Sequence, residues 1–242
     1  MLDKKEILGV GITNATKNEI LEYITKSLEN HHKKYFIVTP NPEFLVYASK
    51  NPKFKTILNN AELALADGIG VMLAGKILKN PLKGRVTGVE LLESLCRVVA
   101  EKPITVGFIG GVDGVAERTA DCLVKKYPGL KVAFASAEYN FYKNYNNYNG
   151  YKHIDILFVA YGAPKQEIWI SENLEKIPVK IAIGVGGAFD YISGKVPRAP
   201  RWAQSIGLEW LSRLIVEPWR IKRQLALLEF IFLVLREKFF RG

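Results

Sequence analysis

Residues 154–185 read IDILFVAYGAPKQEIWISENLEKIPVKIAIGV. The apolar run Ile154–Ala160 has the length of a buried strand, and a turn containing Gly162 and Pro164 follows it. A segment of helical period, Lys165–Lys176, then leads to a second apolar run, Lys180–Val185. A strand, a helix and a second strand in this order are typical of α/β proteins with a parallel sheet.

The same alternation runs along the whole chain of 242 residues. The predicted strands are Ile7–Ile12, Tyr35–Thr39, Glu62–Ala66, Ile104–Ile109, Lys131–Ala135, Ile154–Ala160 and Lys180–Val185. The predicted helices are Lys17–Asn30, Glu43–Lys50, Pro52–Asn59, Gly70–Leu78, Val89–Ala100, Val115–Tyr127, Lys165–Lys176 and much of 205–240. The tyrosine- and asparagine-rich stretch Tyr139–Tyr151 is expected to be a polar surface helix or loop. We therefore predict a Rossmann-like α/β fold: a mostly parallel sheet with helices on both faces.

The C-terminal segment differs from the rest of the chain. Glycine, proline and basic residues around Ser193–Arg201 indicate a boundary between an α/β core, residues 1–194, and a helical appendage, residues 195–242. Ten of the eleven positions from Leu225 to Leu235 are apolar, and basic residues flank them. Because a membrane-spanning helix needs about 20 apolar residues, this run suits a helix lying on an anionic membrane surface. A core or oligomer-interface helix is the alternative.

The charge is concentrated in the same segment. The formal net charge is +10, and residues 195–242 hold ten Lys or Arg against four Glu, a balance of +6. Such a field favours anionic lipid, phosphate-bearing ligands or nucleic acid, although a long apolar run does not suit nucleic-acid binding. The N-terminus has no signal-peptide pattern, so we expect a cytoplasmic protein that is peripheral on the inner face of the cell membrane.

Polar residues follow four of the predicted strands, where ligands bind in open α/β sheets. Thr39 and Asn41 follow one strand and Asp67 the next; Gln166 and the pair Gly186-Gly187 follow the last two. Asp67 is a candidate general base, with helix capping as its alternative. Thr39 and Asn41 could be turn residues between prolines, and the glycine pair could be a tight turn or a close approach to phosphate.

Other nucleotide-binding patterns are weak or absent. A dinucleotide fingerprint after Ile104–Ile109 lacks its first glycine, since Ile109 stands there, and the chain has no Walker A loop. It also has no Asp-x-Asp pair to hold a metal on a nucleotide sugar, so bound phosphates would need arginine, lysine or backbone N–H groups. Arg213, Arg220 and Arg223 offer that charge, within about 80° of one another on a continuous helix, which Pro218 is expected to interrupt.

Seven motifs in order resemble the WecG/TagA/CpsF family of bacterial glycosyltransferases over nearly the whole chain. They are Thr39-Pro-Asn41; Ala66-Asp67-Gly68-Ile-Gly70-Val; Arg85-Val-Thr87-Gly88; Tyr161-Gly-x-Pro164-Lys-Gln166-Glu167-x-Trp169; Gly184-Val-Gly186-Gly-x-Phe189-Asp190-x-x-x-Gly194; Arg198-Ala-Pro200; and Gly207-Leu-Glu209-Trp210-x-x-Arg213 with Glu217-Pro218-x-Arg220-x-x-Arg223.

The resemblance implies an inverting, metal-independent transfer of an N-acetylmannosamine-type sugar from a UDP donor. The acceptor it implies is undecaprenyl-diphosphate-linked N-acetylglucosamine, as in wall teichoic acid linkage-unit synthesis, and no cofactor is expected. It makes Asp67 the base, with Thr39 and Asn41 in the same pocket. Arg85, Gln166 and Gly186-Gly187 would hold the donor, and Arg213, Arg220 and Arg223 would neutralise a diphosphate.

The resemblance also implies a homo-oligomer and an appendage that acts at the membrane. Three alternatives stay open at this point. The first is a non-catalytic, membrane-peripheral nucleotide-binding module, and the second is a transferase of the same family that uses the uronic acid of N-acetylmannosamine or another UDP-hexose. The third, an NAD-dependent oxidoreductase, is disfavoured by Ile109.

Overall fold

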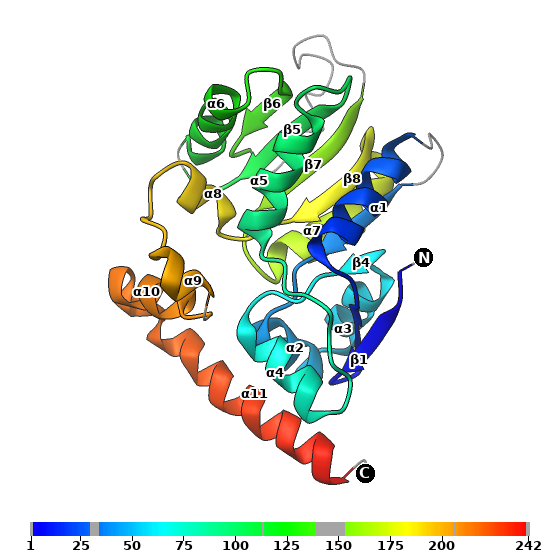
Figure 1. The fold of residues 1–242 in the computed structure, drawn as a ribbon, viewed down its shortest axis with the longest axis vertical. Coiled ribbons are helices and arrows are strands. Elements are labelled where there is room, and N and C mark those ends of the chain that lie inside the picture. The colour runs from blue at the N-terminus through cyan, green and yellow to red at the C-terminus, as the bar shows by residue number, and fades with distance from the viewer. Residues whose placement is uncertain (1, 30–33, 113, 139–152, 206, 241–242) are drawn as a thin grey trace. The chain divides into compact units, whose positions relative to one another are not determined.

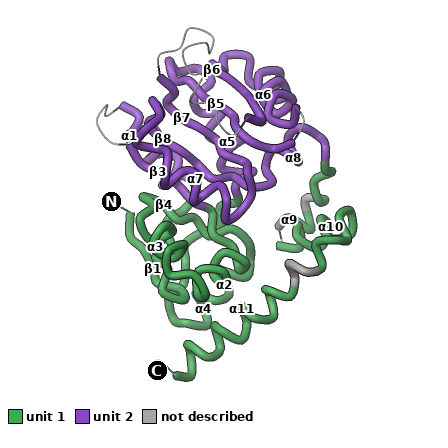
Figure 2. The backbone as a smooth tube through the Cα atoms, turned by 180° about the vertical axis from the view of Figure 1, so that it is seen from behind, with its two compact units in different colours: residues 1–16, 39–87, 196–242 green, residues 17–38, 88–195 purple. Residues whose placement is uncertain are grey.

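The computed structural model describes residues 2–29, 34–112, 114–138, 153–205 and 207–240. The chain forms two compact units, coloured separately in Figure 2. Unit 1 comprises residues 1–16, 39–87 and 196–242, and unit 2 comprises residues 17–38 and 88–195. The predicted division into a core, 1–194, and an appendage, 195–242, stays a prediction. Tyr139–Tyr151 lies outside the described residues.

Unit 2 contains a parallel sheet. Its strands lie in the order β3, β8, β7, β5, β6, and each neighbouring pair is parallel (Figure 1). Their bounds are β3 Tyr35–Val38, β5 Thr105–Gly110, β6 Lys131–Ser136, β7 Ile154–Ala160 and β8 Val179–Gly184. The α/β prediction is confirmed, and the central strand β7 is buried along its whole length, which explains its continuous apolar run.

Helices cover both faces of this sheet. The helices of unit 2 are α1 Lys17–Glu29, α5 Gly88–Val99, α6 Val115–Lys126, α7 Lys165–Asn173, the 3₁₀ turn η2 Leu174–Lys176 and α8 Ala188–Ile192. On one face, Leu157 and Val159 share a buried cluster with Trp169 of α7. Phe158 points to the opposite face and stacks on Phe108, which in turn contacts Phe189 of α8. Successive side chains of a strand alternate between faces, so β7 supplies both cores.

Unit 1 is mostly helical. It holds β1 Lys4–Ile7, β2 Val10–Thr13, α2 Pro42–Lys50, α3 Pro52–Asn60, β4 Leu63–Ala64 and α4 Ile69–Ile77. Its C-terminal part holds α9 Arg201–Ser205, α10 Glu209–Val216, the 3₁₀ turn η3 Pro218–Arg220 and α11 Ile221–Phe240. The predicted interruption at Pro218 is confirmed, because η3 separates α10 from α11.

The prediction of a single strand over Ile7–Ile12 is wrong. The chain turns back at Leu8 and Gly9, and β1 and β2 pair as an antiparallel hairpin in which Ile7 opposes Val10. Leu8 has φ 51° and Gly9 φ 75°, and positive φ at both central residues is typical of a type I′ turn. The predicted strand Glu62–Ala66 is also reduced, to the two residues of β4.

Helix α11 packs along unit 1 beside α2 and α4 (Figure 1). Phe230, Leu233 and Val234 are buried, and Lys50 of α2 forms an ion pair with Glu229 at 2.7 Å. Eight other apolar side chains of this helix are exposed: Ile221, Leu225, Leu228, Ile231, Phe232, Leu235, Phe239 and Phe240. The helix therefore contributes to the core of unit 1 on one side and exposes an apolar row on the other. Within the described ranges, no helix combines the length and hydropathy that a membrane crossing requires.

Candidate active site

Backbone hydrogen bonds in unit 1 join three of the predicted site segments. The Asp67 N–H donates to the Pro40 carbonyl at 2.9 Å, and the Val86 N–H donates to the Ala66 carbonyl at 3.0 Å. The segments that carry Thr39, Asp67 and Arg85 therefore lie side by side, although up to 46 residues separate them in the sequence. In the sequence, Thr39 and Asp67 follow predicted strands and Arg85 is named only from a family motif, and the hydrogen bonds show that the three segments meet.

Asp67 lies two positions before the first residue of helix α4 and is half-buried. The alternative that Asp67 is the N-cap of this helix is wrong, because the N-cap residue is Gly68. Gly68 has φ 90°, a conformation that glycine adopts without steric cost. The predicted role of Asp67 as the base stays a prediction.

The two residues after β3 differ in their surroundings. Thr39 is only 4% exposed. Asn41 is the N-cap of α2, and its Oδ1 accepts a hydrogen bond from the Phe44 N–H at 3.1 Å. The oxygen of the Asn41 side chain therefore has the structural role of capping α2, as the alternative proposed. The predicted contact of Thr39 and Asn41 with substrate stays a prediction.

Arg85 links this region to the C-terminal segment of the same unit. Its Nη2 donates to the Gln204 carbonyl at 3.0 Å, across 119 positions of sequence. Gly207 lies against the first residue of α4, since a Cβ at Gly207 would stand 2.6 Å from the Cβ of Ile69. Arg198 and Glu209, from two of the quoted motifs, form an ion pair at 3.2 Å. The C-terminal segment is therefore packed onto the elements that carry Asp67 and Arg85.

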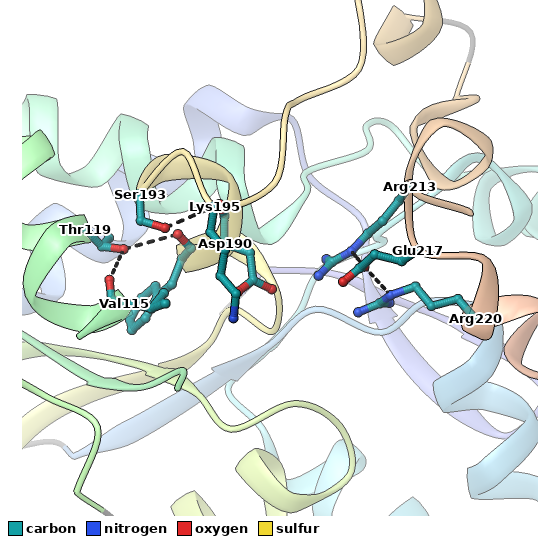
Figure 3. A network of polar contacts seen from close by, with 9 residues as sticks. Val115, Thr119, Asp190, Ser193, Lys195, Arg213, Glu217 and Arg220 are labelled. Atoms are coloured by element: carbon teal, nitrogen blue, oxygen red, sulfur yellow. Dashed lines mark hydrogen bonds and ion pairs between the residues drawn. The ribbon is translucent and has the colours of Figure 1, made fainter. Parts of the chain in front are cut away.

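Two of the three predicted arginines form a cluster (Figure 3). Glu217 Oε2 lies 2.7 Å from Arg213 Nε and 2.5 Å from Arg220 Nε. Burial raises the pKa of the Glu217 carboxyl, but the hydrogen bonds and charges of Arg213 and Arg220 outweigh burial and hold this pKa below its ordinary value. Two guanidinium groups and one carboxylate leave a positive excess. The side chain of Arg223 lies outside the described residues.

Glu217 is part of the last quoted motif, but the sequence prediction assigns it no role, although the spacing of the charges indicates one. Glu217 follows Arg213 by four positions and precedes Arg220 by three. Both spacings place side chains on the same side of a helix. A glutamate at these two spacings therefore predicts ion pairs with both arginines.

The predicted donor-holding residues of unit 2 also meet, at the carboxyl ends of β7 and β8. Gln166 Oε1 accepts a hydrogen bond from the Gly186 N–H at 3.1 Å, and Gln166 Nε2 donates to Glu167 Oε1 at 2.6 Å. The Gln166 side chain is 1% exposed. In this geometry Gln166 contacts the glycine turn at Gly186, and its own side chain is buried.

Helix α8 follows this turn and is anchored to α6. The Thr119 hydroxyl lies 2.7 Å from the Val115 carbonyl oxygen (Figure 3) and 3.2 Å from the Phe189 carbonyl oxygen, and its one proton can be donated to either. Asp190, in the same motif as the glycine pair, lies 3.9 Å from Lys195 Nζ. Among the residues that the structure describes, no three His, Cys, Asp or Glu side chains are grouped to hold a metal ion.

Comparison with known proteins gives one consistent result. The N-acetylglucosaminyldiphosphoundecaprenol N-acetyl-beta-D-mannosaminyltransferase of Bacillus spizizenii strain W23 is 31% identical over 238 residues, which is 98% of this chain and 93% of the relative. Enzymes of the same name from Bacillus subtilis strain 168 and Staphylococcus aureus strain MRSA252 are each 30% identical, over 98% and 97% of this chain and 93% of each relative. The family model described as "Glycosyl transferase WecG/TagA/CpsF family" matches residues 5–242, and the chain belongs to this family of glycosyltransferases.

Proposed function

We propose that this protein transfers N-acetylmannosamine from a UDP donor to N-acetylglucosamine carried on undecaprenyl diphosphate, as in wall teichoic acid linkage-unit synthesis. The observation that carries this proposal is the match to relatives with this enzyme name along 97–98% of the chain. The grouping of Thr39, Asp67 and Arg85 in unit 1 supports it from the structure.

Asp67 is the proposed general base of an inverting transfer. Its carboxylate takes the proton from the acceptor hydroxyl of N-acetylglucosamine while that oxygen forms a bond to C1 of the donor sugar. The bond between C1 and the β-phosphate oxygen breaks, and UDP leaves with the electron pair. A positioned base of this kind contributes about 10²–10⁴-fold to the rate.

The departing UDP carries the negative charge that develops in this reaction. Cationic side chains held in place before the reaction stabilise such charge without reorganisation. Arg213 and Arg220 meet this requirement because both guanidinium groups form ion pairs with Glu217. We propose that this cluster, with Arg223, neutralises the diphosphate of the donor or of the lipid acceptor. The Gly186-Gly187 turn and Arg85 are the proposed contacts of the donor.

Because the proposed acceptor is a membrane lipid, the transfer reaction would take place at a membrane surface. The exposed apolar row of α11 and the basic charge of residues 195–242 support peripheral attachment to the inner face of the cell membrane. A UDP-sugar, a polyprenyl-diphosphate acceptor and an anionic membrane are thus the proposed partners. Self-association into a homo-oligomer is part of the same proposal.

The test is release of UDP with a panel of UDP-sugars and a short-chain lipid-diphosphate N-acetylglucosamine. We expect turnover with UDP-N-acetylmannosamine and a loss of about 10²–10⁴-fold in kcat for Asp67→Asn. Asp121→Asn, at an exposed position of α6, is the matched control and should retain full activity. Turnover by Asp67→Asn at the rate of the control would exclude Asp67 as the base.

The same panel separates the alternatives. Faster turnover with the UDP-linked uronic acid or another UDP-hexose would assign a different donor. A non-catalytic nucleotide-binding module would bind UDP in a calorimeter and transfer no sugar from any donor, and that outcome would refute the proposed function.

A further inference from the structure

Glu167 is a buried carboxyl group that the proposed reaction does not use. It lies in the first turn of α7 and is 0% exposed. Its Oε1 accepts the hydrogen bond from Gln166, while its Oε2 has no hydrogen-bond partner among the described residues. Burial raises the pKa of the Glu167 carboxyl to about 7. A buried, partly satisfied carboxyl group is unfavourable for folding, so stability alone does not explain its presence.

The hydrogen bonds of Glu167 lead directly to the glycine turn. The Gly186 N–H can only donate, and it therefore requires the oxygen end of the Gln166 amide. Glu167 Oε1 accepts from the nitrogen end of the same amide. The two ends of an amide have nearly the same size, so their hydrogen-bond partners decide which way it points. With Glu167 in place, only one orientation of Gln166 satisfies both neighbours.

Close packing holds this pair of side chains against β8. A Cβ at Gly184 would stand 2.9 Å from Gln166 Nε2 and 3.0 Å from Glu167 Oε1. The absence of a side chain at Gly184 is therefore what gives the pair its space beneath the turn. Gly186 itself has φ +54°, and a Cβ added there would meet no atom within 4 Å, so local crowding does not fix the turn.

We propose that Glu167 is a positioning residue for the donor: it orients the Gln166 amide, and Gln166 in turn holds the Gly186-Gly187 turn. The inference rests on the proposed function, in which that turn contacts the UDP-sugar. It predicts that the acceptor oxygen of Glu167 matters for donor binding, whereas its negative charge does not.

Two substitutions separate these properties. Glu167→Gln keeps an oxygen that can accept from Gln166, and Glu167→Met has a similar length and no hydrogen-bond acceptor of comparable strength. We expect the donor KM of Glu167→Gln to stay within about twofold of the unsubstituted protein, and that of Glu167→Met to rise by up to about fivefold with kcat nearly unchanged. Glu172→Met, at an exposed position of the same helix, is the matched control and should leave the donor KM unchanged.

Amide hydrogen exchange at Gly186 tests the inference without any turnover. Exchange should be faster in Glu167→Met than in Glu167→Gln or the unsubstituted protein. The Tm of Glu167→Met should stay close to that of the unsubstituted protein, because removal of a buried carboxyl group offsets the hydrogen bond that Gln166 Nε2 loses. Equal donor KM and exchange in all variants would overturn the inference. Equal impairment of Glu167→Gln and Glu167→Met would assign the effect to the charge, and a large fall in Tm would assign Glu167 to folding; either result also overturns it. If the unsubstituted protein transfers no sugar, the proposed function fails, and the exchange at Gly186 still decides the role of Glu167.

Discussion

Substitution of Gly184 by alanine should weaken donor binding, because the added methyl group would displace the side chains of Gln166 and Glu167. The new Cβ would stand 2.9 Å from Gln166 Nε2 and 3.0 Å from Glu167 Oε1, whereas ordinary contacts of a Cβ are 3.4–4 Å. Both side chains are buried and joined by a hydrogen bond of 2.6 Å, so each must move by about 0.5 Å to restore normal contact. Overpacking of this kind costs about 1–3 kcal/mol of stability.

The same displacement reaches the glycine turn. The bond from Gly186 N–H to Gln166 Oε1 is 3.1 Å long, and a shift of about 0.5 Å takes it beyond the range of a hydrogen bond. The loss of one neutral hydrogen bond costs about 1 kcal/mol. If that bond holds the turn in its binding conformation, the donor KM rises about fivefold.

Gly194→Ala is the control for this experiment. Gly194 has φ +75° and nothing within 4 Å of an added Cβ, so alanine there brings backbone strain of about 1–2 kcal/mol without crowding the pair. Urea unfolding and the donor KM, measured by UDP release, should show similar losses of stability in both variants and a raised KM only in Gly184→Ala. An unchanged donor KM in Gly184→Ala, despite reduced stability, would refute the coupling between Gln166 and the turn.

Two further predictions concern stability and membrane attachment. Asp155 Oδ2 accepts a hydrogen bond from the Thr105 N–H at 2.8 Å, and its Oδ1 lies 2.6 Å from Lys180 Nζ. Burial raises the pKa of the Asp155 carboxyl, but the hydrogen bonds from Lys180 and Thr105 outweigh burial and hold this pKa below its ordinary value. This carboxylate therefore stabilises the fold above the unfolded pKa of about 3.9 and ceases to do so as the pH falls through its lower folded pKa. Asp155→Asn should lower the free energy of unfolding in urea by about 3 kcal/mol at pH 7. The difference from the unsubstituted protein should shrink below pH of about 4, and a difference that does not change with pH would contradict this role of the Asp155 carboxylate. The double substitution Leu228→Ser with Phe232→Ser, at side chains 67% and 61% exposed, should reduce co-flotation with anionic phosphatidylglycerol vesicles and leave Tm unchanged, whereas undiminished flotation would exclude this face of α11 as the attachment surface.

The sequence predicted the central strands of the sheet well because β5, β7 and β8 are buried on both faces. Such strands are continuous apolar runs, and the predicted run Ile154–Ala160 matches β7 residue for residue. The hairpin of β1 and β2 was missed for a local reason: its turn places a leucine, Leu8, at positive φ. Leucine carries no turn signal, and the apolar residues on either side read as one strand.

The site was predictable only in part, for a reason that Glu167 and Arg85 illustrate. The rule that ligands bind at strand ends led to Asp67, Gln166 and the glycine turn. It gave no information on which polar groups become buried, since a glutamate in the first turn of a helix is usually solvated. The contact of Arg85 with Gln204, 119 residues away, is likewise a property of the packed unit and has no local signal.

Helix α4 connects the proposed base to the proposed membrane helix within unit 1. Its first residue, Ile69, follows Asp67 by two positions and lies against Gly207. The next residue, Gly70, faces Phe230 of α11, whose Cε1 would stand 3.8 Å from a Cβ at Gly70, and Pro42 of α2, whose Cγ would stand at 2.8 Å. The backbone entering α4 is therefore fixed by the C-terminal segment on one side and by the Thr39–Pro42 segment on the other. Since close-packed interiors transmit displacement, a shift of α11 at a membrane surface would act on the loop that carries Asp67. We therefore expect attachment of α11 to a membrane to affect the position of Asp67 in the proposed enzyme.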